Sequence, residues 1–417
     1  MKITEKNYRL VVLGCCFAIF VTLSGMVNST GSLFIVPVSE AFGFSRSSFS
    51  LTLSLSTVSG IFINLFYGKL QKRLGVRLMV ALGFASAIVA YILLWQAKTL
   101  ALFYLGGLLA GLGLGFNSTT TIALIINNWF KRRKGTLLGC VSAGSGLGGF
   151  LFNSIFGAVI ASHGYQAAYL LTVIVLICVA IPVVALLREH PPESAAETKD
   201  TPDLDEEYFT GFKRMLHQPK IWRTFLAAFL IGASVHAVLV AIPGQLQLQG
   251  FGAAQASTIY GGVFLVMGIT KIFMGWLNDR CGIRLTTILS ISCFLIGATM
   301  LIFTSTPAVA WVFVVIFGLA LPSEAVLVPL IARNVMTKRQ YGEYLGIYIA
   351  SLIAGLTAGV PVINFFYDAF GSYTPALLFN VALGILSLWL LLPVLDDKKN
   401  KLDKTEGPAI TQAPIYK

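Results

Sequence analysis

Two charged residues lie deep inside long apolar stretches of the sequence, Lys271 and Glu324. A charged side chain at the centre of a bilayer costs roughly 2.5–3.5 kcal/mol, so each should face a bundle interior and have a partner. We expect the Lys271 ammonium to receive the carboxylate of a substrate. We expect Glu324 to balance that charge when no substrate is bound, and to take up a proton. The alternative is an ion pair that only fixes the packing of two helices.

Five further polar residues fall inside apolar stretches. His236 is a second candidate for proton coupling, because imidazoles change charge near neutral pH; it could equally be a hydrogen-bonded packing residue. The other four are candidates for substrate contact, with hydrogen bonding between helices or simple packing as the alternative. They are Asn28, Asn64, Asn117 and Tyr348. Neither a cluster of His, Asp and Glu nor a nucleophile–base pair appears, so we expect no enzymatic activity, cofactor or metal.

The composition requires lipid as the solvent of most of the chain. Of 417 residues, 56% are hydrophobic and 12% are charged, about half the charged fraction of an ordinary soluble domain. The net charge of +12 comes from basic residues between the apolar stretches, so it indicates a membrane partner and not nucleic acid. The six cysteines lack metal-ligand spacing and are expected to be small apolar packing residues.

Twelve apolar segments are long enough to be membrane-spanning helices, which need about twenty residues each. The fold class predicted from them is an all-α membrane protein of two six-helix bundles. The segments cover 10–38, 48–68, 78–97, 100–128, 135–161, 165–187, 222–246, 253–277, 284–305, 307–332, 342–366 and 373–394. We expect an N-terminal bundle over 1–187, a linker over 188–221, a C-terminal bundle over 222–394 and a tail over 395–417.

The basic residues predict the orientation. If both termini and every second loop are cytoplasmic, all but three of the 30 Lys and Arg residues lie in the cytoplasm. The exceptions are Arg46 and Lys98 outside and Lys271 within a span. The positive-inside rule therefore favours a multi-pass protein of the inner, cytoplasmic membrane with both termini inside.

An internal repeat relates the two halves. The segment GKLQKRLGVR, which begins at Gly68, recurs 207 residues later as GWLNDRCGIR from Gly275. The same offset relates NNWFKRRKGTLLGCVSA to RNVMTKRQYGEYLGIYIA. Two matches at one offset predict parallel six-helix repeats about an axis normal to the membrane. The offset also pairs Lys271 with Asn64 and Glu324 with Asn117.

The repeated loop resembles the G-x-x-x-D-R-x-G-R-R signature of the major facilitator superfamily, which implies an alternating-access carrier. The second copy follows the signature closely, whereas Lys72 replaces its usual Asp in the first copy. By this resemblance the two loops act in gating. The residues concerned are Gly68, Arg73, Gly75, Arg77, Gly275, Asp279, Arg280, Gly282 and Arg284.

A narrower resemblance is to the branch of monocarboxylate transporters and oxalate:formate antiporters. Its members begin one helix with an aromatic pair, a basic cluster and small residues, as the segment from Trp129 to Gly149 does. They also carry a cation, generally Arg, four residues before the signature glycine, where Lys271 precedes Gly275. Oxalate-type members add a lysine where Tyr348 stands, which disfavours a dicarboxylate here.

Together these features predict a secondary active transporter that moves a small organic anion, a monocarboxylate, with proton symport. The alternatives are an antiporter of organic anions, a carrier for amphipathic acids or amino acids, and a non-transporting solute sensor. The expected partners are the substrate, protons and the lipid bilayer, and we expect a monomer.

Overall fold

A computed structural model describes residues 5–130, 134–188, 219–335 and 338–395. The described part is almost entirely helical and contains no β-strand. Most of the expected linker and tail lies outside the described residues, as does the basic cluster 131–133. Each of the twelve expected spans falls on a helical segment, which confirms the predicted fold class.

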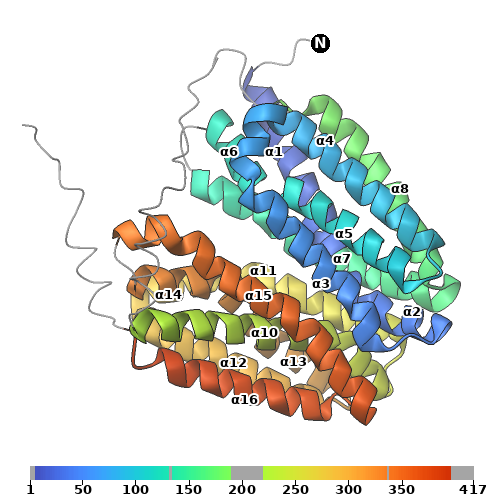
Figure 1. The fold of residues 1–417 in the computed structure, drawn as a ribbon, viewed down its shortest axis with the longest axis vertical. Helices are drawn as coiled ribbons and strands as arrows, with labels where there is room; N and C mark the ends of the chain where they lie inside the picture. Colours follow the sequence, from blue (N-terminus) through green and yellow to red (C-terminus); the bar gives the residue numbers. More distant parts are fainter. Residues whose placement is uncertain (1–4, 131–133, 189–218, 336–337, 396–417) are drawn as a thin grey trace, which may run out of the picture.

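The first six spans follow one another from the N-terminus (Figure 1). The first span is built from four short helical pieces and the fourth from two, whereas the others are single helices. The elements are α1 (Glu5–Ile19), η1 (Phe20–Asn28), η2 (Gly31–Phe34), α2 (Ile35–Phe42), α3 (Arg46–Leu65), α4 (Tyr67–Gln96), α5 (Leu100–Phe116), α6 (Thr119–Trp129), α7 (Lys134–His163) and α8 (Tyr165–Leu186).

The second six spans repeat this arrangement, and again the fourth span of the half is interrupted. The elements are α10 (Pro219–Leu248), α11 (Ala253–Cys281), α12 (Ile283–Ile302), α13 (Pro307–Ala320), η3 (Ser323–Leu327), α14 (Val328–Val335), α15 (Lys338–Phe370) and α16 (Thr374–Leu391). In the described residues, ten helical stretches are long and apolar enough to cross a membrane. The remaining two spans are α3, where eight of twenty residues are Ser or Thr, and α13, which has fourteen residues.

The interruptions have local causes that periodicity did not reveal. In the fourth span the helix stops at Phe116 and restarts at Thr119, with Ser118 in an extended conformation. In the tenth span Pro322, which has no backbone N–H to donate, separates α13 from the π-helical turn η3. Asn117 and Glu324, which the 207-residue offset pairs, both lie at these breaks. The repeat thus extends to helix irregularities, and π-turns are common at functional sites.

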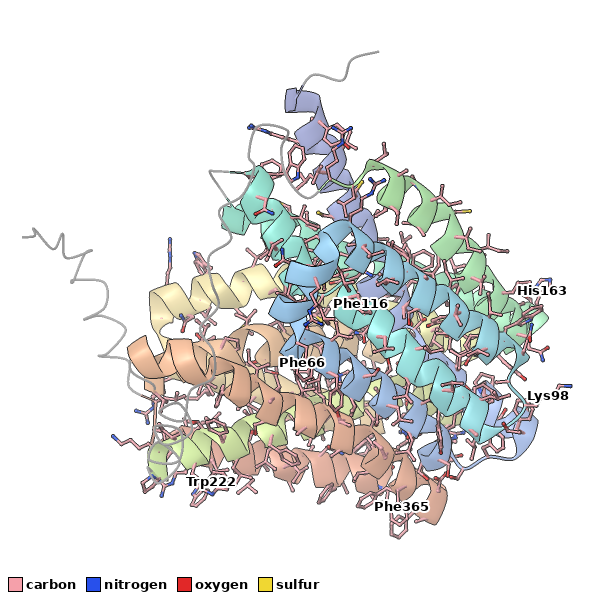
Figure 2. All side chains as sticks on the ribbon, turned by 45° about the horizontal axis from the view of Figure 1, so that its top comes forward. Phe66, Lys98, Phe116, His163, Trp222 and Phe365 are labelled. Atoms are coloured by element: carbon pink, nitrogen blue, oxygen red, sulfur yellow. The ribbon has the colours of Figure 1, made fainter. Side chains whose placement is uncertain are left out.

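The outer surface carries large apolar side chains. Trp222 and Phe365 are 58% and 62% exposed, and Figure 2 shows them on the outside of the C-terminal half. A helix pairs its backbone N–H and C=O groups with one another, as a bilayer interior requires. The protein is therefore a multi-pass membrane protein.

The two halves touch along α7 with α11 and along α3 with α15. Glycines allow this approach: a Cβ added at Gly146 would stand 2.9 Å from the carbonyl oxygen of Phe264, and one at Gly261 would stand 2.9 Å from that of Phe150. Farther along the same two helices, a Cβ at Gly139 or Gly275 would meet no other heavy atom within 4 Å. The halves therefore meet at one end and diverge toward the other.

We call the end where the halves meet the Arg46 side, because it carries Arg46 and the turn between α15 and α16. The opposite end, with the turns at Gly75 and Gly282, is the Arg280 side. In Figure 1 the halves lie together near α2 and diverge toward α6 and α14. The molecule is thus open toward the Arg280 side.

Candidate functional site

A central cavity of about 300 Å³ lies between the two halves. Its wall combines apolar side chains with polar ones from η1, η2, α3, α6 and α7 in the N-terminal half and from α10, α11 and η3 in the C-terminal half. The lining residues are Phe20, Ser24, Val27, Asn28, Ser29, Ser32, Leu53, Ser56, Thr57, Thr119, Ser145, His236, Leu239, Val240, Tyr260, Phe264, Met267, Lys271, Leu321 and Glu324.

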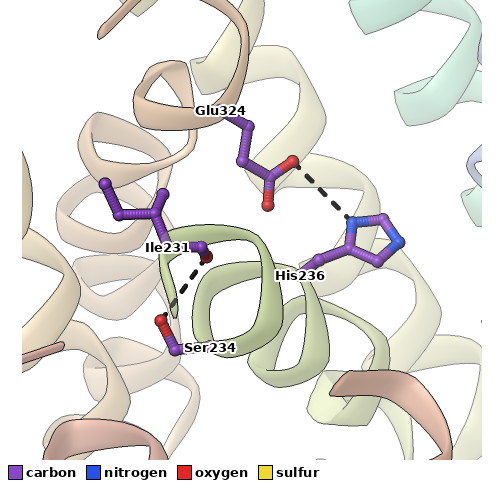
Figure 3. Close-up of polar contacts among 4 residues, drawn as sticks. All are labelled: Ile231, Ser234, His236 and Glu324. Atoms are coloured by element: carbon purple, nitrogen blue, oxygen red, sulfur yellow. Dashed lines mark hydrogen bonds and ion pairs between the residues drawn. The ribbon is translucent and has the colours of Figure 1, made fainter. Parts of the chain in front are cut away.

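The C-terminal half supplies the ionisable groups of this wall, Lys271, His236 and Glu324. The carboxylate of Glu324 lies 3.8 Å from Nδ1 of His236, and the two side chains point toward each other from different elements (Figure 3). They are 18% and 30% exposed, so both remain accessible from the cavity. The sequence identified His236 and Glu324 as separate candidates, and the fold brings them together.

Lys271 and Glu324 both line this cavity, from α11 and from η3. Within the described part of the chain, however, Lys271 makes no direct ion pair with Glu324. A lysine that is paired tightly inside the protein would be unavailable to a ligand. The observed arrangement leaves the ammonium within the cavity wall, with a carboxylate close by and no salt bridge to it.

Local structure places each ionisable group. His236 and Lys271 lie in the middle of the long helices α10 and α11, whereas Glu324 is the second residue of the π-helical turn after Pro322. Near His236, the buried hydroxyl of Ser234 donates to carbonyl oxygens of its own helix, at 2.7 Å to Leu230, and to Ile231 as Figure 3 shows. That hydroxyl is therefore not available to the cavity.

The N-terminal half supplies a neutral, hydroxyl-rich wall. Its polar members are Ser24, Asn28, Ser29, Ser32, Ser56, Thr57, Thr119 and Ser145. The sequence pointed to Asn28 but missed Ser56, Thr57 and Ser145, because Ser and Thr are common in membrane helices as packing residues. The high density of Ser and Thr in α3 is the sequence feature that could have identified this helix as part of the cavity wall.

Three predicted contact residues lie outside the cavity lining. Asn64 donates its amide N–H to the Gly60 carbonyl at 3.1 Å, one turn back in α3. Asn117 is 3% exposed and donates to the Gly113 carbonyl at 3.2 Å. Tyr348 is fully buried, with its ring edge-on to Phe225 at 5.1 Å between centroids. The two asparagines thus bond to their own helix backbones and the tyrosine fills the bundle, so the structure does not bring these three side chains to the cavity.

The predicted gating loops occupy equivalent turns on the Arg280 side. Gly75 and Gly282 both have positive φ, 73° and 89°, which glycine adopts without strain. Arg77 donates its Nε–H to the Val184 carbonyl at 2.9 Å and so caps the end of α8. Arg280 lies over the Trp276 ring at 4.8 Å. The side chain of Asp279 lies outside the described residues.

A polar cluster joins the two halves on the Arg46 side. Asp368, in α15, accepts hydrogen bonds at 2.9 Å from the backbone N–H groups of both Arg46 and Ser47, the first residues of α3. The Arg46 guanidinium lies 3.7 Å from the centre of the Tyr367 ring and donates to the Tyr373 hydroxyl at 3.3 Å. The sequence predicts that Arg46 lies outside the membrane but does not reveal its contacts with the other half, which only the fold shows.

Comparison with known proteins gives a consistent family. A profile described as Major Facilitator Superfamily matches residues 15–261 and 224–415. The chain is 26% identical to the MFS-type transporter YcxA of Bacillus subtilis (strain 168), covering 95% of this chain and 98% of that protein. It is 24% identical to the oxalate:formate antiporter of Oxalobacter formigenes, covering 61% of this chain and 60% of that protein.

Solved structures show the same fold at low sequence identity. The nucleoside transporter NupG matches with a TM-score of 0.75 and 14% identity, covering 93% of this chain and 99% of that one. A bacterial homologue of the human lysosomal transporter Spinster, in an inward-facing and unoccupied conformation, matches with a TM-score of 0.68 and 15% identity. That match covers 96% of this chain and 98% of the other.

Proposed function

Because the chain belongs to the major facilitator superfamily and is therefore a transporter and not an enzyme, we propose that it carries a small organic anion, a monocarboxylate, by alternating access with proton symport. The observation that carries this proposal is the position of Lys271 in the wall of the cavity between the halves. Charged groups at membrane depth in transporters commonly mark the substrate or ion pathway.

The anion preference follows from the charges of the cavity. Lys271 is the lysine of this wall, and it has no direct ion pair in the described structure. A carboxylate entering from the Arg280 side would become the counter-ion of the ammonium. Its charge-assisted hydrogen bond to Lys271 would compensate for the water that the carboxylate loses on binding. A cationic solute would bring a second positive charge beside Lys271, which is unfavourable.

Proton coupling follows from competition for the same lysine. With the cavity empty, Glu324 lies in the same wall as Lys271 and can balance its charge. A bound substrate carboxylate becomes the counter-ion of the lysine instead, and Glu324, left without that partner, takes up a proton. The loaded carrier then holds fewer uncompensated charges, which favours passage through the occluded state.

The orientation of the carrier in the membrane is the one that the basic loops predict. The Arg280 side, rich in Lys and Arg, faces the cytoplasm, and Arg46 lies on the outer side of the inner membrane. In this orientation the described conformation is inward-open. We propose that both termini are cytoplasmic and that the monomer is the transporting unit.

Counterflow in proteoliposomes tests the anion site. Lys271→Ala should abolish exchange of labelled monocarboxylates while the protein still inserts and folds, and Lys271→Arg should keep part of it, because the charge stays while the donor geometry changes. Ser234→Ala is a suitable control, because that hydroxyl is directed to its own helix. Undiminished exchange by Lys271→Ala would refute the assignment. Binding without exchange in the wild type would indicate a sensor.

Uptake driven by an imposed pH gradient tests coupling. Glu324→Gln keeps the shape of the side chain but removes its titration, so counterflow at equal pH should persist while proton-driven accumulation is lost. If Glu324→Gln still concentrates substrate when only a pH gradient is supplied, Glu324 is not the coupling residue. Exchange that requires an internal anion and ignores the pH gradient in the wild type would identify an antiporter.

A further inference from the structure

The polar side chains of the N-terminal wall differ in whether they are free to bind a ligand. Some are satisfied by their own helices: the hydroxyls of Ser29, Thr57 and Ser145 donate to backbone carbonyls at 3.0, 3.2 and 2.8 Å. Ser32 is buried. The four others are accessible in the cavity and make no side-chain hydrogen bond to any described residue. These free polar groups are Ser24, Asn28, Ser56 and Thr119.

The free groups come from three separate elements that converge on one cavity. Ser24 and Asn28 are one turn apart in the π-helical piece η1, Ser56 is in α3, and Thr119 begins α6 after the break in its span. Asn28 is exposed to the cavity, although its neighbours Val27 and Ser29 are buried. An amide there offers two donors and one acceptor.

We propose that the substrate is a hydroxylated monocarboxylate, whose hydroxyl groups are recognised by the four free polar groups while its carboxylate is held by Lys271. This inference rests on the proposed function and names the substrate class for the same site. The two ends of such a molecule match the two walls, one neutral and hydrogen-bonding, the other charged.

The physical reason is the cost of unmade hydrogen bonds. An aliphatic tail pressed against these groups would displace their water and leave several donors and acceptors unpaired. A site built to bind a hydroxyl rejects an analogue without it far more strongly than an apolar pocket rejects an extra methylene. We therefore expect a hydroxylated acid to bind with an affinity at least about tenfold higher than that of the unsubstituted acid of equal length.

The neutrality of the N-terminal wall excludes other classes. The described cavity lining places no charged side chain in that half, so the second carboxylate of a dicarboxylate would be buried without a counter-ion there. An ammonium group at the far end of an amino acid would meet the same lack of a counter-ion. Hydroxyl groups are neutral, and each can both donate and accept.

A series of four-carbon acids tests the class. The probes are butanoate, 4-hydroxybutanoate and 2,3,4-trihydroxybutanoate, with succinate and 4-aminobutanoate as the charged alternatives. Competition against counterflow by the full-length protein should show affinity rising with hydroxyl count, by at least about tenfold from butanoate to the trihydroxy acid. Butanoate binding as tightly as the hydroxylated acids, or tightest binding of succinate or 4-aminobutanoate, would overturn the proposal.

Matched variants locate the recognition. Asn28→Ala and Ser56→Ala should each reduce the preference for the trihydroxy acid over butanoate several-fold, while leaving butanoate binding nearly unchanged. Ser154→Ala is the control, because Ser154 lies in α7 outside the cavity lining and its hydroxyl bonds to the Phe150 carbonyl at 2.9 Å, and it should leave the preference intact. An unchanged preference in both test variants would refute the role of the free groups.

Lys271→Ala separates this inference from the proposed function. If that variant loses all five acids while the wild type does not discriminate by hydroxyl count, the anion site holds and the hydroxyl preference is wrong. If Lys271→Ala still binds the acids as the wild type does, the proposed function itself fails, and with it the inference.

Discussion

The contact between the halves on the Arg46 side makes a quantitative prediction about the conformational equilibrium. Asp368 accepts two backbone hydrogen bonds from the first turn of α3 across the boundary between the halves. These N–H groups are the unsatisfied donors of a helix N-terminus, where a carboxylate is favoured. In the alternating-access cycle that we propose, the Arg46 side opens, so both bonds must break in the other state.

Asp368→Ala should therefore shift the equilibrium toward the conformation that is open on the Arg46 side. Hydrogen bonds to a charged group contribute about 1.5–3 kcal/mol each, but Asp368 is exposed, so we take about 2 kcal/mol for the two together. At 1.4 kcal/mol for each factor of ten, the population ratio should change about thirtyfold.

Distances between spin labels measure this ratio. Labels at His163 and Gln255, the exposed residues at the Arg46-side ends of α7 and α11, should show a larger long-distance population in Asp368→Ala. Glu40→Gln is the matched control, because Glu40 is an exposed acidic residue near the same side whose side chain makes no hydrogen bond to a described residue of the other half. An unchanged distance distribution in Asp368→Ala would refute the argument that these bonds hold the side closed.

Three substitutions and one control test the packing that the fold depends on. Gly75→Ala should lower the melting temperature of the purified protein, since a side chain at φ 73° costs about 1–2 kcal/mol. Gly111→Val should lower it further, by about 1–3 kcal/mol of stability, because a side chain there collides with the Ser56 carbonyl of α3; Gly139→Ala, in open space, should cause no loss. Ser54→Ala removes the 2.8 Å hydrogen bond to the Thr357 carbonyl and should shift the label distances as Asp368→Ala does, by about fivefold for about 1 kcal/mol.

The sequence determined the architecture because the bilayer leaves few alternatives. A chain this apolar, with its charges confined to regular intervals, can satisfy its backbone only as a bundle of helices. The repeat at 207 residues then required two similar halves. The free-energy cost of a charge inside the membrane also identified Lys271 and Glu324, since a charged residue in an apolar span is expected to have a function or a partner.

Only the tertiary structure decided which polar residues meet. By pseudo-symmetry, Asn64 and Asn117 are the counterparts of the charged residues Lys271 and Glu324. In the structure their amides donate to carbonyls one turn back in their own helices, a bond that an asparagine can make anywhere along a helix. His236 lies in α10 and Glu324 in the π-helical turn directly after Pro322, so their contact joins two elements that are far apart in the sequence. Hydrophobic periodicity does not specify which residues of two such elements meet.

The same limit applies to the contacts between the halves. Asp368 caps the start of α3, although it is 322 residues away from Arg46 in the sequence. This contact follows from the way the two bundles pack against each other. Each half buries apolar surface of its own, so the amino-acid composition does not specify how the two halves are placed relative to each other. The sequence thus specified the halves and the charges between them, whereas the side on which they close was decided by side-chain contacts of high sequence separation.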